Sequence, residues 1–268
     1  FNCYWLLLMI IAGKEITPDF LLAVKLGLVP GFSSMNKFGR RAAATSGNDL
    51  WAPGGLNSNY ITTAIPVEID STSANDATGG TGMRTARVYG LGENWENQSE
   101  VCPLGGLTPY VLQNNYMRVF RIEPLTGGSL RTNAGNVIVQ PQGGGITLSY
   151  VLAGKGQTQQ AIYCVPGGHT AYMLNWYVGI ADTNKNGELA QFELLTMNNA
   201  NGDGIWAVKG DASCYNIGTS SAERVYGIPS GGFSEKTDIR INVSAVTSPV
   251  TVIGGFDLLL VENGYINV

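Results

Sequence analysis

The chain has 268 residues, with 16 Lys and Arg against 20 Asp and Glu, so its formal net charge is −4. Charged residues make up 13% of the chain, about half their usual share of roughly 25%, whereas the 36 glycines are about twice their average share. A mildly acidic chain with so few cations is a poor match for a phosphate backbone, so we expect no nucleic acid partner. The composition favours short strands joined by tight turns over long charged helices.

The counts of histidine and cysteine exclude several kinds of catalytic and metal site. His169 is the only histidine, so sites that need two imidazoles are excluded. No Gly-x-Ser-x-Gly motif supplies a nucleophile and no carboxylate pair stands out, so we expect no enzyme activity and no cofactor. The four cysteines are widely spaced without a C-x-x-C motif, which predicts buried free thiols. They are Cys3, Cys102, Cys164 and Cys214.

Residues 1–56 are predicted to form an apolar segment, a short helix and an extended arm. Residues 3–12 are an unbroken apolar run of ten residues, shorter than the roughly 20 that cross a membrane, so we expect no membrane partner. The Thr-Pro-Asp sequence at 17–19 is typical of a helix start. Residues 31–56 are rich in glycine and have little periodic core of their own, which predicts an arm that lies across a second subunit.

This arm contains the one dense basic patch of the sequence, in which three cations fall within residues 37–41. Phe38 would anchor a contact with another subunit, and the two arginines, Arg40 and Arg41, would pair with carboxylates at its rim. The residues predicted to make such contacts are Phe20, Asn36, Lys37, Phe38, Arg40, Arg41 and Trp51.

From residue 60 onward, β-branched and alternating segments follow one another with turn signals between them. These segments are 60–69, 84–91, 116–123, 136–140, 146–152, 160–165, 170–181, 188–197, 204–209, 224–228, 237–245 and 250–261. We predict an all-β fold of two antiparallel β-sandwich or jelly-roll-like domains, preceded by the helix and the arm. The glycine run at 143–145 places the domains at residues 57–143 and 144–268.

Residues 182–193 match the pattern of a twelve-residue calcium loop. The candidate ligands are Asp182, Asn184, Asn186, Glu188 and Glu193. A calcium hand needs a helix on each side, whereas residues 172–180 are aromatic and β-branched. Because Asn186-Gly187 is also a leading hairpin dipeptide, we predict a hairpin turn and no metal here, with calcium as the alternative.

A set of segments between residues 17 and 263 carries a family resemblance. They are 29–40 (Val-Pro-Gly-Phe-Ser-Ser-Met-Asn-Lys-Phe-Gly-Arg), 49–51, 71–78, 132–136, 156–163, 165–172, 237–240 and 255–261. In these segments the chain resembles virion structural proteins of tailed bacteriophages, of the type found with marine and cyanobacterial hosts. The resemblance implies a location in the phage particle, on the outer capsid surface.

The resemblance also implies a capsid decoration (cement) protein, which binds the major capsid protein and stabilises the head. We expect a homo-oligomer, a trimer, for this role. A tail or neck component is an alternative location. A second alternative is a host-surface or glycan-binding module on the virion, in which loops near Trp95 or Trp206 stack on a sugar.

Overall fold

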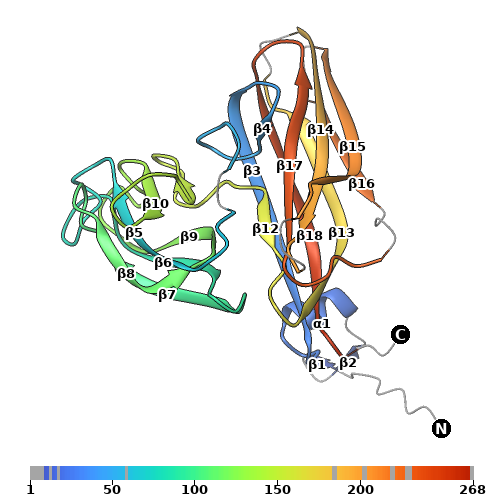
Figure 1. The fold of residues 1–268 in the computed structure, drawn as a ribbon, viewed down its shortest axis with the longest axis horizontal. Coiled ribbons are helices and arrows are strands. Elements are labelled where there is room, and N and C mark those ends of the chain that lie inside the picture. The colour runs from blue at the N-terminus through green and yellow to red at the C-terminus, as the bar shows by residue number, and fades with distance from the viewer. Residues whose placement is uncertain are drawn as a thin grey trace.

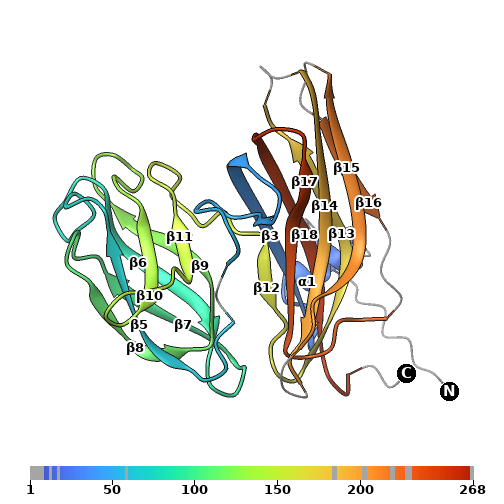
Figure 2. The ribbon, with the colours of Figure 1, turned by 45° about the horizontal axis from the view of Figure 1, so that its top comes forward.

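The computed structural model describes residues 9–11, 14–16, 19–57, 60–182, 186–200, 204–217, 221–226 and 231–265. It confirms the all-β prediction: antiparallel sheets make up the described chain, and its one helix is α1 (Phe20–Lys25). Figures 1 and 2 show two β-domains side by side, a longer one that contains the segments nearest both termini and a smaller one between them in sequence.

The longer domain is a sandwich of two sheets. One sheet has the order β16-β13-β18-β3, from β3 (Phe32–Ala44), β13 (His169–Ile180), β16 (Ser221–Tyr226) and β18 (Val250–Glu262). The other has the order β12-β17-β14-β15, from β12 (Ile162–Cys164), β14 (Asn186–Asn198), β15 (Ala207–Ile217) and β17 (Thr237–Val246), and the short β4 (Asn48–Asp49) also pairs with β17. Counted along the chain without β4, the eight strands are ordered 6-3-8-1 and 2-7-4-5, which is the strand order of a jelly roll.

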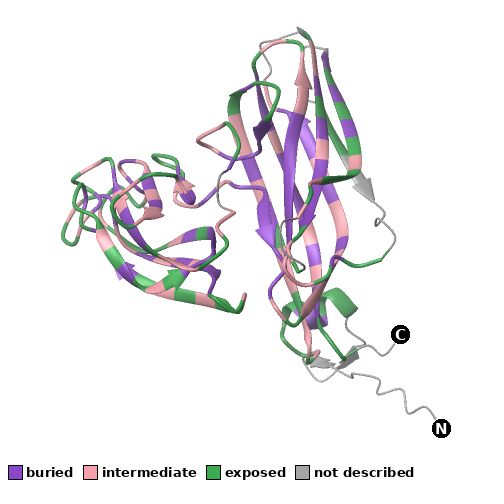
Figure 3. Cartoon of the chain, viewed as in Figure 1, coloured by how far each residue is buried: buried purple, intermediate pink, exposed green. Residues whose placement is uncertain are grey.

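Alternating apolar residues of both sheets fill the space between them. Trp176 and Phe256 from one sheet meet Phe192 and Ile241 from the other in a single buried cluster. Figure 3 shows buried residues along the facing strands of this domain, and exposed residues along α1 at one end. The space between the two sheets of the jelly roll is therefore filled by side chains and does not form an open barrel.

The predicted hairpin at Asn186-Gly187 is wrong. The strands before and after it, β13 and β14, belong to opposite sheets and do not pair with each other, so they form no hairpin. Gly187 has a φ of 84°, and the register between β14 and β15 shifts between Asn186 and Glu188. The glycine is thus used for a β-bulge, which needs the same positive φ as the expected turn.

The smaller domain is inserted into the jelly roll between β4 and β12, and we call it the inserted domain. Its strands are β5 (Ile65–Ser71), β6 (Met83–Leu91), β7 (Asn97–Pro103), β8 (Tyr110–Tyr116), β9 (Arg118–Gly127), β10 (Val137–Pro141) and β11 (Ser149–Val151). They form sheets of order β11-β10-β5-β8 and β7-β6-β9, which enclose a core of their own. The edges of β7 and β8 are joined by Glu100, whose carboxylate accepts from the backbone N–H groups of Gln113 and Asn114, both at 2.9 Å.

The insertion leaves and re-enters the jelly roll at one place. Trp51 and Gln160 form an antiparallel bridge, and Ala161 N donates to Leu50 O at 2.9 Å. The two connections of the inserted domain therefore lie side by side. Adjacent ends allow a whole domain to be inserted without disturbing the host fold.

The domain organisation differs from the predicted one at two points. The expected extended arm is strand β3, which pairs with β18 from Phe32 to Ala44. The inserted domain extends beyond residue 143 to include β11, because Val151 pairs with Val137 of β10. In both cases the partner strand decides the boundary, and local composition does not show it.

The N-terminal elements lie at one end of the jelly roll (Figure 1). Strands β1 (Met9–Ile11) and β2 (Lys14–Ile16) pair with each other, and Asp19 caps α1 by accepting from Leu21 N at 2.9 Å. No helix in the described ranges is long and apolar enough to span a membrane. Cys102, Cys164 and Cys214 are buried as predicted, and the first two are free thiols. Cys3 lies outside the described residues.

Candidate functional site

Three of the residues predicted to contact a second subunit are used inside the chain. Lys37 and Trp51 are 6% and 4% exposed, and the Trp51 indole donates to Gly54 O at 3.0 Å. Arg41 donates to Ala52 O at 3.1 Å and to Pro53 O at 3.2 Å. Lys37 and Trp51 therefore have little surface left for a contact with a second subunit, whereas Arg41 is half-buried. The contact role of these three residues stays a prediction.

The other four predicted contact residues keep part of their surface. Phe20 is 48% exposed on α1 and lies edge-on against Phe32, with 5.6 Å between ring centroids. Asn36 is exposed on β3 and donates to Asp257 Oδ1 at 2.7 Å, whereas Phe38 and Arg40 are half-buried. Their role in contacts between subunits stays a prediction.

The residues of the calcium-loop pattern do not converge. Asn184 lies outside the described residues, and Asn186 is the first residue of β14. Glu188 and Glu193 are five residues apart on that strand, about 16 Å at the rise of an extended chain. Ligands of one calcium ion must lie within roughly 5 Å of each other. Asp182 instead accepts from Thr251 N at 2.6 Å, so the extended backbone of β14 rules out the loop.

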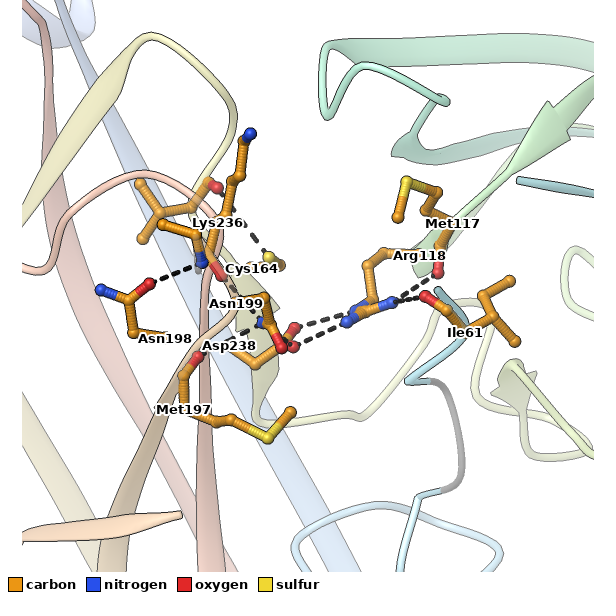
Figure 4. A network of polar contacts seen from close by, with 11 residues as sticks. Ile61, Met117, Arg118, Cys164, Met197, Asn198, Asn199, Lys236 and Asp238 are labelled. Carbon is orange, nitrogen blue, oxygen red and sulfur yellow. Dashed lines mark hydrogen bonds and ion pairs between the residues drawn. The ribbon is translucent and has the colours of Figure 1, made fainter. Parts of the chain in front are cut away.

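The densest set of buried charged groups lies where the inserted domain meets the jelly roll (Figure 4). Arg118, the first residue of β9, forms a bidentate pair with Asp238 of β17, at 2.9 Å from Nε and 2.7 Å from Nη2. The side chains are 5% and 1% exposed. Arg118 Nη1 also donates to Ile61 O and Met117 O, and Asn199 Nδ2 donates to Asp238 at 2.8 Å. This pair binds the two domains together.

A second buried ion pair lies next to it, within the jelly roll. Asp49 Oδ2 accepts from Arg240 Nη1 at 3.2 Å and from Asn57 N at 2.8 Å, and Asp49 Oδ1 accepts from Asn242 at 3.1 Å. Burial raises the pKa of Asp49 above its ordinary value, although Arg240 and the hydrogen bonds act in the opposite direction. The Arg240 guanidinium stacks 4.0 Å from the Trp206 ring, which places an aromatic side chain over the pair.

Three aromatic residues surround these arginines. Tyr60 lies edge-on against Trp206 at 5.1 Å, and Arg118 lies 5.2 Å from the Trp95 ring and 5.5 Å from the Tyr60 ring. Trp95 has a φ of 64°, which is uncommon for a residue other than glycine and is often found at functional sites. The two tryptophans that the sequence marked separately thus converge on one place between the domains.

A cleft of about 470 Å³ opens at this place. Its lining includes Tyr60, Trp95, Arg118, Met197 and Asn199. Aromatic rings beside amide and guanidinium groups suit a ligand with both flat apolar faces and hydroxyl groups. We call it the aromatic cleft.

A second feature of the domain junction is a buried lysine. Lys37 Nζ of β3 donates to Phe120 O of β9 at 2.5 Å and lies 5.6 Å from the Phe120 ring. Burial, and after it the nearby Arg121 guanidinium, lower the pKa of Lys37 from its ordinary value to about 7. Lys37 and Arg121 both line a cavity of about 280 Å³ beside the junction.

The sequence did not reveal the residues of the two buried ion pairs. Arg118 and Asp238 are 120 positions apart, and Arg240 and Asp49 are 191 apart. The single signal was indirect: Arg118 interrupts an apolar strand in a chain with few charges. In such a chain, a charged residue inside a strand is a candidate for a buried pair.

The comparisons with known proteins leave the family open. No family model matches the chain, and no curated protein is significantly similar to it. The solved structures that it is similar to include infectious bursal disease virus, Gt strain, with 9% identity and a TM-score of 0.24 over 93% of this chain and 79% of that chain. The Gx strain of the same virus gives 9% identity and a TM-score of 0.24 over 88% and 73%. Both similarities are to structures of virus particles, at TM-scores too low to carry an argument.

Proposed function

We propose that this chain is a non-enzymatic structural protein of a virus particle, in which the jelly roll is the attached domain and the inserted domain projects from it. The observation that carries the proposal is the complete jelly-roll strand order, 6-3-8-1 and 2-7-4-5, a fold common in capsid proteins. The packed core between its sheets, with Trp176, Phe192 and Phe256, supports a structural role. The resemblance to phage virion proteins points the same way.

Within the particle we propose a capsid decoration role on the outer surface, with the major capsid protein as partner and a homotrimer as the assembled form. The end of the jelly roll that carries α1 supplies an attachment surface. Three of its apolar side chains, Phe20, Leu22 and Leu26, are between 46% and 54% exposed. A surface with few charges costs less to desolvate, so large parts of it can be buried against neighbours.

The proposal is tested on purified particles with an antibody against the recombinant chain and quantitative mass spectrometry. We expect a copy number comparable to that of the major capsid protein. A small number of copies at one vertex would favour the tail or neck. Absence of the chain from purified particles would refute a structural role in the virion. Leu22→Asp should reduce binding to particles lacking the protein, whereas Val208→Asp, an exposed apolar position on β15, serves as the control.

The aromatic cleft supports a second candidate function, a glycan-binding module on the virion. Trp95 and Tyr60 offer ring faces, and Asn199 offers an amide, on the wall of one cleft. A glycan array with the wild-type chain and Trp95→Ala tests it. Binding that Trp95→Ala abolishes and Tyr215→Ala preserves would support the module, because Tyr215 is an exposed aromatic on β15 that does not line the cleft. An array without hits would refute it.

A further inference from the structure

Lys37 is a buried cation whose hydrogen bonds are incompletely used. An ammonium group has three N–H donors, and the described chain gives Nζ one acceptor, Phe120 O. The ion pairs in the described residues are Arg118 with Asp238, Arg121 with Glu123, and Arg240 with Asp49. Lys37 belongs to none of them. A buried lysine is almost always paired, so the lack of an anion beside it needs an explanation.

The charged group that acts on Lys37 is a second cation. Arg121 of β9 lowers the pKa of Lys37, which adds to the effect of burial. Its own carboxylate partner, Glu123 at 3.3 Å, also accepts from Tyr89 OH at 2.5 Å. On the strand next to β3, the Asp257 carboxylate accepts from Asn36 at 2.7 Å and from Asn175 at 2.8 Å. The neighbouring carboxylates are therefore engaged elsewhere.

Lys37 and Arg121 face one cavity. It has a volume of about 280 Å³ and lies between β3 of the jelly roll, β9 of the inserted domain and the connection that returns from it. Gln157 and Thr158 of that connection complete the lining with an amide and a hydroxyl group. A water molecule occupies roughly 30 Å³ of liquid, so the cavity has room for a small anion and some solvent.

We propose that this cavity is a binding site for a small oxyanion, which lies between Lys37 Nζ and the Arg121 guanidinium with the Gln157 amide as a further donor. Carboxylate, phosphate and sulfate share this chemistry. The bound charge would offset the desolvation of Lys37 and the repulsion between the two cations. Because Lys37 and Arg121 come from different domains, the anion would also hold the domains together. The inference is independent of the proposed virion role.

The test is thermal unfolding of the full chain at pH 7 in an imidazole buffer at constant ionic strength, with chloride replaced stepwise by inorganic phosphate, sulfate or glucuronate. We expect a saturable rise in Tm with at least one oxyanion, since a ligand that binds the folded state stabilises it. Lys37→Met should abolish the rise, and Arg121→Gln should weaken apparent binding at least tenfold. The exposed Lys209→Met is the matched control and should respond as the wild type does. A preference for phosphate or for glucuronate would identify a free phosphate or the carboxylate of an acidic sugar as the ligand.

A second measurement works on the unaltered side chain, in case Lys37→Met does not fold. NMR titration of the ¹³Cε signals of labelled lysines should show one lysine whose pKa is higher in the oxyanion than in chloride. Equal Tm values in every salt, or a rise that Lys37→Met and Lys209→Met share, would overturn the proposal. So would a Lys37 titration that does not depend on the anion.

Discussion

Replacing Arg118 with methionine should destabilise the chain by about 3–5 kcal/mol, because it leaves the Asp238 carboxylate buried without a counter-ion. The structure buries both side chains, at 5% and 1% exposure, and joins them by two hydrogen bonds of 2.9 and 2.7 Å. Arg118→Met also removes the bonds to Ile61 O and Met117 O. Asn199 remains as a donor to Asp238, but an amide does not supply a charge.

The double variant Arg118→Met with Asp238→Val separates the attraction of the pair from the cost of a lone buried charge. Apolar replacement of a whole buried pair is often nearly neutral. We therefore expect the double variant to be more stable than either single variant, with a coupling of about 2 kcal/mol or more. Asn199 loses one acceptor but keeps its bond to Lys236 O at 2.8 Å.

The assay is urea unfolding at pH 7, followed by tryptophan fluorescence and far-UV circular dichroism, with coincident transitions required before free energies are compared. Arg121→Met in chloride buffer is the matched control. It lies three residues along β9 and breaks an ion pair that is 44% and 31% exposed, so it should cost about 1 kcal/mol or less. If Arg118→Met costs no more than Arg121→Met, the pair is hydrated in solution and the reasoning about the domain junction fails.

The other predictions concern positions around the same junction. Lys37 has a pKa of about 7 in the folded chain and its higher, ordinary pKa in the unfolded chain. Above pH 7 the unfolded chain therefore binds more protons than the folded chain. The free energy of unfolding should then rise with pH, by up to about 1.4 kcal/mol per pH unit. Urea midpoints from pH 7 to 8.5 should show this slope in the wild type and its loss in Lys37→Met; equal slopes would contradict it. Gly39→Ala should cost about 3 kcal/mol or more, because a Cβ there would meet Leu50 O at 2.1 Å, whereas Ser33→Ala on the same strand should be nearly silent in thermal unfolding. Trp206→Ala should lower Tm because it exposes the Asp49–Arg240 pair. If the Tm values of Trp206→Ala and Tyr215→Ala differ by less than about one degree, the stacking of Trp206 on Arg240 contributes nothing to stability.

The sequence predicted the fold class because its signals are local. Alternating strands, glycine turns and the scarcity of charge are all visible within short windows, and they led to an all-β, two-domain prediction. The role of residues 32–44 was missed because the partner of β3 is β18, about two hundred positions away. The Asn186-Gly187 dipeptide correctly indicated a positive φ, but a bulge and a hairpin turn require the same local conformation.

The candidate site is formed by residues that are far apart in the sequence, so no short stretch of sequence could indicate it. Trp95 and Trp206 were predicted as separate sugar-binding candidates, and it is the docking of the domains that places both beside Arg118 and Arg240. Lys37 was predicted to contact a second subunit because it belongs to the basic patch of the expected arm. Its burial follows from the approach of Phe120, which belongs to the other domain.

The buried charged residues of the chain gather at the domain junction, and their geometry bears on how the two domains are oriented. Among the described residues, every buried cation lies at the junction, and so do two of the buried carboxylates: Lys37, Arg118, Arg240, Asp49 and Asp238. Apolar residues would join two domains at least as strongly, because the desolvation of a buried ion pair offsets most of the electrostatic attraction between its charges. Apolar contact does not fix an angle, however, whereas the planar fork of Arg118 meets Asp238 in one geometry. The chain has only 16 Lys and Arg, and within the described ranges its buried cations are all at this junction. This placement is explained if the ion pairs fix the direction in which the inserted domain projects, rather than the strength with which it is held.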